Sequence, residues 1–288
     1  MEDAHISIAN LFSGASLFAV LDGHGGSEVA QYVSDKLPDI IKASPHAKSK
    51  QWKDVMVNAF STMDNNISQE KGRKDLVEYF KKASHDEFSP TTELDVYKHV
   101  GCTACVALLA DGQIIVANAG DSRCVMGKGK EAVDLSDDHK PNNDKEKARI
   151  LNAKGFVEDN RVNGVLNLSR SFGDYEYKLN TALKPEEQQV ISLPDVRIEK
   201  ITSDVDFVVL ACDGIWECWE SKKVVDFVYD KLRSNPKIAL SQIIDELFEK
   251  IISPDCNTPA LAMSTARSAI TSESEMWMCG HLHADKTP

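Results

Sequence analysis

Short apolar runs that end in Asp-Gly pairs mark several elements of this chain. Residues 17–21 are apolar and stop at such a pair, which is typical of a buried strand followed by a tight turn. Residues 102–110 and 113–119 flank a second pair, the usual signature of a β-hairpin, and another turn follows at residues 127–129. Residues 205–212 form a further apolar run that ends in Asp-Gly. These runs predict buried strands.

Other stretches repeat their apolar residues with the period of a helix. From residue 51 onward these residues share one helical face: Trp52, Val55, Met56, Ala59, Phe60 and Met63. An earlier helix is expected to start near Ser27 and to end before Pro38. Residues 142–153 are polar and compatible with a helix, and Gly155 is placed to cap its C-terminus.

Two helices are predicted in the C-terminal half. Ser221 can cap a helix whose inner face is Val224, Val225, Val228 and Leu232. A further helix carries Ile243, Ile244, Leu247, Phe248 and Ile251 on one face. Residues 81–99 are expected to form a surface loop, and residues after 253 show no strand or helix pattern. Because strands and helices cluster instead of alternating strictly, the sequence favours an α+β layered fold over a doubly wound parallel sheet.

Composition and charge exclude several classes of protein. The chain has 288 residues, of which 42% are hydrophobic, which is an ordinary globular balance, and internal repeats are not visible. The formal charge of −12 disfavours nucleic acid as a partner, and no apolar run reaches the ~20 residues of a membrane helix. The odd count of 7 cysteines, scattered through apolar segments, predicts reduced thiols. We therefore expect a soluble, monomeric protein of the cytoplasm or nucleus.

Acidic residues beside glycines are the main candidates for chemistry. Asp22 and Asp213 each follow an apolar run and precede a glycine, and Glu2-Asp3 and Asp121 also lie beside small residues. Taken singly, each Asp-Gly pair is explained by turn formation. If several of these carboxylates converge, they require a cation, and hard oxygen ligands suit Mg²⁺ or Mn²⁺. His24 could serve as a general acid or be a solvated turn histidine.

Two cysteine patterns admit a metal site, but a simpler interpretation is favoured for both. Cys102 and Cys105 have the spacing of a zinc or redox pair, yet no second pair is nearby and the segment resembles a strand, so buried core thiols are predicted. Cys279, His281 and His283 could bind metal adventitiously near the end of the chain, but a disordered tail that carries these residues by chance is the favoured interpretation.

Eight successive segments resemble the motifs of the metal-dependent serine/threonine phosphatases of the PP2C type, in the family's order across about residues 1–255. They are Met1-Glu2-Asp3-Ala4-His5, Phe18-Ala19-Val20-Leu21-Asp22-Gly23-His24-Gly25-Gly26, Gly101-Cys102-Thr103-Ala104, Ala117-Asn118-Ala119-Gly120-Asp121-Ser122-Arg123, Asp138-His139-Lys140-Pro141, Arg161-Val162-Asn163-Gly164, Ser169-Arg170-Ser171-Phe172-Gly173-Asp174 and Leu210-Ala211-Cys212-Asp213-Gly214-Ile215-Trp216-Glu217.

The resemblance implies a fold and a reaction. The fold is a four-layer α-β-β-α sandwich of two antiparallel sheets flanked by antiparallel helices, with two Mg²⁺ or Mn²⁺ ions between the sheets. The reaction is hydrolysis of phosphoserine and phosphothreonine in phosphoprotein substrates by a metal-bridging hydroxide. The segment at residues 140–178 resembles the family's flap beside the active site, whose contacts would tune substrate choice.

The resemblance also implies roles for individual residues. Asp22 would bridge the metals, the Gly23 carbonyl would bind one ion and Asp213 the other, while Glu2 and Asp3 would hold metal-bound waters. His24 would protonate the departing oxygen of the serine or threonine. A weaker third metal site would involve two further residues, Asp121 and Glu217, although Glu217 is one methylene longer than the aspartate often found there.

The chain departs from the family pattern at both ends. The family's phosphate-gripping Arg precedes Met-Glu-Asp, which here stands at residue 1, and its C-terminal Gly-x-Asp-Asn motif has no counterpart after Leu247. We therefore expect a phosphatase domain at residues 1–255 that lacks the family's first and last strands, and a poorly ordered tail at residues 256–288. Activity is expected to be impaired. The alternative is a catalytically weak or inactive phosphatase-like module that binds a phosphoprotein.

Overall fold

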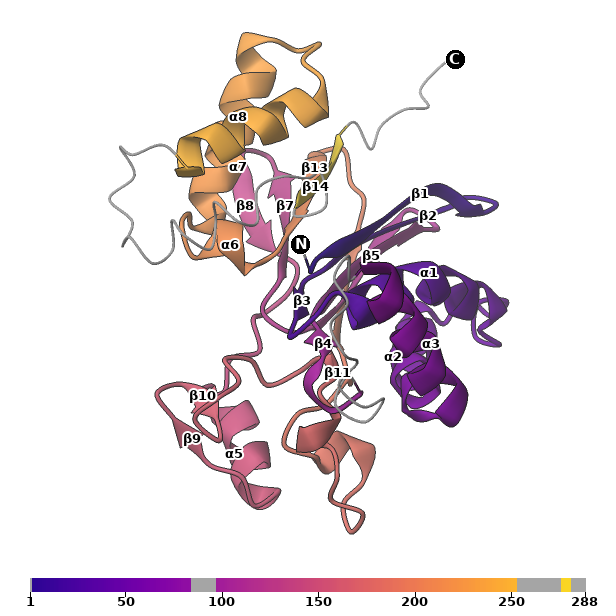
Figure 1. The fold of residues 1–288 in the computed structure, drawn as a ribbon. Helices are drawn as coiled ribbons and strands as arrows, with labels where there is room; N and C mark the ends of the chain where they lie inside the picture. Colours follow the sequence, from indigo (N-terminus) through magenta and orange to yellow (C-terminus); the bar gives the residue numbers. More distant parts are fainter. Residues whose placement is uncertain (1, 84–96, 253–275, 281–288) are drawn as a thin grey trace.

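Two antiparallel sheets form the centre of the molecule (Figure 1). In this computed structural model, residues 2–83 and 97–252 are described, together with the backbone of residues 276–280. The larger sheet has the strand order β1-β2-β5-β6-β12, with bounds β1 Ala4–Phe12, β2 Ala15–Leu21, β5 Ala104–Ala110, β6 Gln113–Ala119 and β12 Asp195–Lys200. The smaller sheet has the order β14-β13-β7-β8, with bounds β14 Met276–Gly280, β13 Val205–Ala211, β7 Arg123–Lys128 and β8 Glu131–Asp134.

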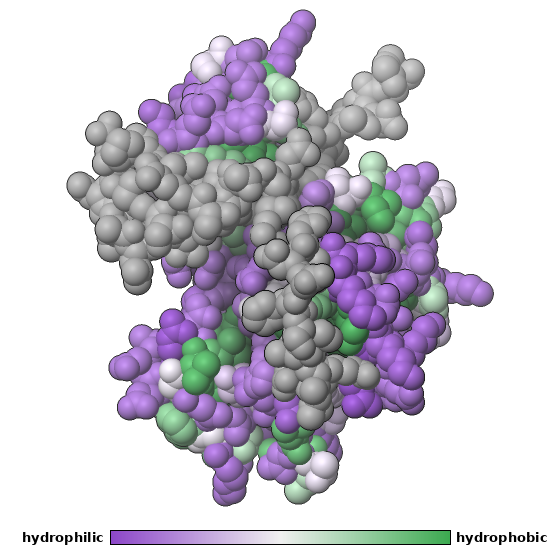
Figure 2. Space-filling view, viewed as in Figure 1, coloured by the Kyte–Doolittle hydropathy of each residue, from purple (hydrophilic) through white to green (hydrophobic). Residues whose placement is uncertain are grey.

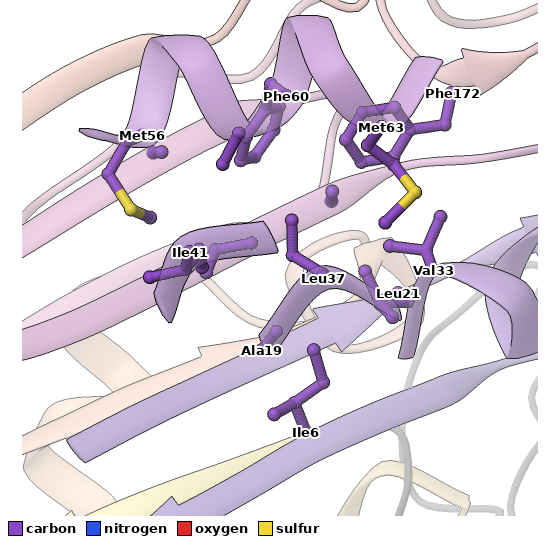
Figure 3. Close-up of a cluster of buried hydrophobic side chains, with 14 of the residues drawn as sticks. Ile6, Ala19, Leu21, Val33, Leu37, Ile41, Met56, Phe60, Met63 and Phe172 are labelled. Carbon is purple, nitrogen blue, oxygen red and sulfur yellow. The ribbon is translucent and has the colours of Figure 1, made fainter. Parts of the chain in front are cut away.

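Helices cover the outer face of each sheet, so the α+β sandwich expected from the sequence is confirmed (Figure 1). The larger sheet packs against α1 Glu28–Ala43 and α2 Trp52–Ser68, and α3 Glu70–Ala83 packs against these two helices. The smaller sheet packs against α6 Asp213–Trp216, α7 Ser221–Ser234 and α8 Leu240–Ile252. Figure 3 shows side chains of α1 and α2 that face β2. Leu37 and Ile41 of α1 and Phe60 of α2 lie on the side of Ala19 and Leu21.

A layer of buried apolar side chains joins the two sheets. Val20, Cys105 and Val116 come from the larger sheet and meet Cys124 and Leu210 of the smaller one, and all are buried. Cysteine behaves here as a small hydrophobic residue, as predicted. No disulfide links the five cysteines whose side chains the structure describes to one another: Cys102, Cys105, Cys124, Cys212 and Cys218. Burial of this layer fixes the relative position of the strand ends.

A segment between β8 and β12 extends from one end of the sandwich (Figure 1). It contains α5 Asp144–Asn152, the hairpin β9 Val157–Glu158 and β10 Arg161–Val162, strand β11 Phe172–Gly173, and short 3₁₀ turns at Tyr175–Tyr177 and Pro185–Glu187. A small apolar cluster of Ile150, Val162, Tyr177 and Val190 holds it together. Figure 2 shows apolar surface over the β9–β10 hairpin, where Phe156 and Val165 are exposed.

A third sheet has three two-residue strands in the order β11-β4-β3, with β4 at Gly101–Cys102 and β3 at Gly23–His24. It connects the end of β2 to the segment that carries β11. Although short, it determines which side chains meet beside the end of the sandwich.

Gly155 contributes to the C-terminal cap of α5 as predicted, because its amide donates a hydrogen bond of 2.9 Å to the Ile150 carbonyl, but the left-handed residue is Lys154, with φ 67°. Two other local predictions are wrong. Helix α1 continues through Pro38 to Ala43 because burial of Leu37 and Ile41 offsets the one hydrogen bond that proline cannot donate.

Ser221 does not cap α7 either. It is the first helical residue, Glu220 is the N-cap, and the Ser221 hydroxyl accepts a hydrogen bond of 3.0 Å from Arg123. The hydroxyl is thus committed to a tertiary contact that sequence spacing does not reveal.

The tail also contains a strand that the sequence pattern does not indicate. β14 pairs antiparallel with β13, with Met276 opposite Ala211 and Gly280 opposite Phe207. The expectation of no regular element after residue 253 is therefore wrong at this strand. The predicted surface loop at residues 81–99 overlaps the end of α3, its residues 97–99 are helical, and its residues 84–96 lie outside the described residues. His281 and His283 also lie outside them.

The helices of the described residues include none that is long and apolar enough to cross a membrane.

The contact between Gly127 of β7 and Phe207 of β13 tests the packing of the smaller sheet. The two residues are paired across the strands, and a Cβ on Gly127 would lie 2.5 Å from the Phe207 ring. We expect Gly127→Ala to lower the free energy of unfolding by about 1–3 kcal/mol, because the ring cannot move within a close-packed core. Chemical denaturation measures this loss.

The double variant Gly127→Ala/Phe207→Leu should lose less than the sum of the two single losses, with a coupling above about 0.5 kcal/mol. Gly214→Ala is the control, because its nearest neighbouring atom would lie 3.7 Å away. Strictly additive losses would contradict the steric explanation.

Candidate active site

Asp22 and Asp213 lie at corresponding ends of strands from the two facing sheets. Asp22 follows β2, and its carbonyl accepts a hydrogen bond of 2.9 Å from the Thr103 amide. Asp213 follows β13 by two residues and begins α6. Burial raises the pKa of Asp22 well above its usual range, and the carboxylates of Asp3, Asp213 and Asp121 raise it further. The structure therefore brings these predicted residues together.

The N-terminal residues Glu2 and Asp3 contact the loop after β2. The Asp3 carboxyl forms hydrogen bonds with Asp22 and with the backbone of Gly23, but burial outweighs them and raises the pKa of Asp3. Glycine is required at position 23, because a Cβ there would lie 2.1 Å from the Glu2 carbonyl oxygen. The Glu2 side chain is exposed and adds negative charge beside Asp3.

Asp121 is almost fully buried, with 2% of its surface exposed, and its carboxylate pairs with Lys140. Burial tends to lower the pKa of Lys140, but Asp121, Asp213 and Glu217 outweigh burial and raise it. The ammonium group therefore faces the carboxylates to which the family resemblance assigns a third metal. Sequence reasoning did not anticipate this positive charge.

His24 is held by a carboxylate from a distant part of the chain. Its Nε2 lies 2.8 Å from Oδ2 of Asp174, and the side chain of His24 is 26% exposed whereas that of Asp174 is 3% exposed. Burial alone would lower the pKa of His24, but Asp174 outweighs burial, and Asp121 and Glu2 add to the effect, so the pKa is raised. His24 is thus a paired histidine facing the acidic cluster, and not simply a solvated turn residue.

The chemistry of this cluster fits a divalent cation. Burial and neighbouring carboxylates, above all that of Asp121, raise the pKa of Asp213 to about 7, so the carboxylates cannot all stay ionised without added positive charge. Among the described residues no group of three or more His, Cys, Asp or Glu side chains is arranged around one point as a complete metal cage. Mg²⁺ does not require such a cage, because it keeps several waters and binds through one or two carboxylates.

Two residues of the site, Lys140 and Asp174, were not given a role from the sequence. Both lie inside segments that resemble family motifs, Asp138-His139-Lys140-Pro141 and Ser169-Arg170-Ser171-Phe172-Gly173-Asp174, which was the available signal. The predicted residues Asp22, Asp213, Asp3, Glu2, Asp121, Glu217 and His24 interact with one another through charge or hydrogen bonds.

Oxygen donors that lack compensating charge, beside a histidine able to give a proton, are the chemistry of metal-assisted hydrolysis. The comparisons with known proteins agree. Residues 1–258 match the sequence profile of the family described as protein phosphatase 2C. The chain belongs to this family, whose members depend on divalent metal ions.

Proteins from several organisms are similar to this chain in sequence or in fold. The chain is 36% identical over 289 residues to probable protein phosphatase 2C 21 of Arabidopsis thaliana, covering 90% of this chain and 79% of the relative. It is 45% identical over 235 residues to protein phosphatase 2C homolog 2 of Schizosaccharomyces pombe, covering 79% and 58%. A phosphatase from Toxoplasma gondii has the same fold, with a TM-score of 0.67 at 23% identity, covering 97% and 88%.

The raised pKa values predict how stability depends on pH in the metal-free protein. Asp213 binds its proton more tightly in the folded protein than in the unfolded chain, so the folded state holds more protons up to a pH of about 7. Stability should therefore fall as pH rises from 6 to 8. We expect the melting temperature to drop by a few degrees over this interval, as measured by calorimetry.

Asp213→Asn should flatten this dependence, because the amide does not titrate. Millimolar Mn²⁺ should raise the melting temperature of the wild-type protein more at pH 8 than at pH 6. A wild-type melting temperature that rises with pH between 6 and 8 would contradict the assignment of the carboxylate cluster.

Proposed function

We propose that this protein is a metal-dependent protein serine/threonine phosphatase that hydrolyses phosphoserine and phosphothreonine in phosphoprotein substrates. The observation that carries the proposal is the crowding of Asp3, Asp121 and Asp213 around Asp22, next to His24, in a chain of this family. Carboxylates crowded in one site repel phosphate unless cations lie between them, and metal cations can also stabilise the charge that develops during phosphoryl transfer.

Two Mg²⁺ or Mn²⁺ ions would be held by Asp22, the Gly23 carbonyl and Asp213, with Glu2 and Asp3 supporting their water ligands. When bound, such ions neutralise the phosphoryl oxygens and lower the pKa of a water that can attack phosphorus. Asp121 and Glu217 are the candidates for a weaker third ion, which would have to share Asp121 with Lys140.

The residues of the chain supply the proton for the leaving group. His24 faces the acidic cluster and is raised in pKa, so it is charged over a wider pH range than a free histidine and can protonate the departing oxygen of serine or threonine. Cys102 is fully buried, and burial raises the pKa of its thiol well above the usual range. It therefore remains a neutral thiol and is not suited to act as a nucleophile.

A second candidate is a phosphatase-like module that binds a phosphoprotein with little or no turnover. The observation that favours it is in the sequence. Residues 248–288 contain no Gly-x-Asp-Asn segment, the motif to which the resemblance assigns a ligand of the second metal. Without the carboxylate of that motif, the site would bind at least one ion less tightly, and turnover would be slower.

Hydrolysis of p-nitrophenyl phosphate and of a phosphothreonine peptide, each with millimolar Mn²⁺ or with EDTA, tests the proposal. We expect turnover that requires the metal and that falls by about 10³-fold in Asp22→Asn, because several kcal/mol of charge stabilisation are lost with the metal. Asp39→Asn is the matched control, since Asp39 is 81% exposed and pairs with Lys42 on the outer helix α1.

A folded wild-type chain with no Mn²⁺-dependent turnover would refute the phosphatase proposal. Binding of the phosphothreonine peptide by that chain, measured by calorimetry, would then support the second candidate.

A further inference from the structure

The three-stranded sheet β11-β4-β3 places His24 and Asp174 on either side of Gly101. Gly101 of β4 is paired with His24 of β3 on one side and with Gly173 of β11 on the other. Neighbouring strands are about 4.8 Å apart, so the backbones of the two outer strands are separated by about 10 Å. The side chains of His24 and Asp174 meet across this distance only by passing over the central strand.

Gly101 provides the space in which they meet. A Cβ at this position would lie 2.3 Å from Oδ2 of Asp174 and 2.6 Å from Nε2 of His24. Any larger residue would displace both partners. The glycine of the Gly101-Cys102-Thr103-Ala104 segment is thus explained by the histidine–carboxylate pair that lies over it.

Asp174 is held in one orientation by its own backbone and by a neighbouring hydroxyl. Its φ of 52° is left-handed, which is uncommon for a residue other than glycine. Its amide donates to the Val100 carbonyl at 3.1 Å, and the Ser171 hydroxyl donates to the same Oδ2 that binds His24. The carboxylate is therefore fixed before any substrate binds.

Asp64 of α2 fastens the segment that carries Asp174. Its Oδ1 accepts hydrogen bonds of 3.1 Å from the Gly173 amide and from the Tyr175 hydroxyl. Lys178, whose side chain is 7% exposed, lies 3.0 Å from both Asp64 oxygens and also donates to the Ser171 carbonyl. A helix of the outer layer thus supports the residues on both sides of Asp174.

We infer that Asp174 is a positioning residue for catalysis, which orients His24 through Nε2 and leaves Nδ1 as the atom that gives a proton to the leaving group, while Asp64 keeps Asp174 in place. This inference rests on the proposed phosphatase function. As water attacks phosphorus, the electron pair of the breaking P–O bond passes to the serine or threonine oxygen. The Nδ1 proton moves to that oxygen. The ring is then neutral, and its remaining proton stays on Nε2, hydrogen-bonded to Asp174.

Asp174→Asn tests the inference through the leaving group. The variant keeps the size of the side chain but removes the charge that orients the imidazole. A threonine alkoxide is a strong base and requires a proton, whereas p-nitrophenolate leaves without one. We expect kcat for the phosphothreonine peptide to fall by about 10²-fold and kcat for p-nitrophenyl phosphate by less than about 5-fold.

Three further variants make the signature specific. His24→Asn should show the same selective loss, and Asp174→Asn/His24→Asn should be no slower than His24→Asn alone, because the two residues act as a unit. Asp64→Asn should show a smaller loss in the same direction, of about 10-fold for the peptide. Asp39→Asn on α1 should leave kcat unchanged for both substrates.

Nitrogen NMR of the histidine side chains supplies a readout that does not depend on turnover. The His24 signal is identified by its absence in His24→Asn. In the metal-free wild-type protein, neutral His24 should carry its proton on Nε2, and this preference should be lost in Asp174→Asn.

The outcomes separate this inference from the proposed function. Equal losses on both substrates, or none, in an active enzyme would overturn the positioning role and leave the phosphatase function intact. No metal-dependent turnover in the wild-type protein would overturn the phosphatase function. In that case an unchanged Nε2 preference in Asp174→Asn would also overturn the positioning role.

Discussion

Repulsion among carboxylates at the end of the β-sandwich is the constraint on which the rest of the site depends. The pKa of Asp22 is raised well above its usual range, because Asp22 is buried and crowded by Asp3, Asp213 and Asp121. Lys140 pairs with Asp121, but burial and the neighbouring carboxylates still raise the pKa values of Asp3, Asp22 and Asp213. Under the proposed function, a divalent cation at this place would lower the free energy of the folded state, and the same cation would bind the phosphoryl oxygens of a substrate.

The sandwich maintains this crowding by keeping its strand ends fixed. Carboxylates that repel one another would move apart on mobile loops, but Asp22 and Asp213 follow strands β2 and β13, in each of which all residues but one are buried. The apolar layer between the sheets prevents either strand from sliding, because a shift would open cavities among close-packed side chains. The same packing that stabilises the core therefore also holds the carboxylates close together against their mutual repulsion.

Sequence periodicity predicted the elements that have one buried face, and it failed where a tertiary contact outweighed local preference. The apolar face of α2 was evident from Trp52 to Met63, and all of these residues are buried. The continuation of α1 past Pro38 was not evident, because it depends on burial of Ile41 against another layer. Strand β14 was not evident either, since its partner β13 lies about 70 residues earlier and short strands owe their stability to such pairing.

The sequence by itself determined the class of fold, the acidic residues at strand ends and the choice of His24 as a candidate site residue. Each of these is marked by a local pattern or by an ordered family motif. The tertiary structure alone decided that Lys140 faces Asp121 and that Asp174 binds His24 across a separation of 150 residues. The contact between Asp174 and His24 depends on the pairing of β3 and β11 with β4 at Gly101. Such pairings arise only when distant segments are brought together by folding, so no local spacing records them.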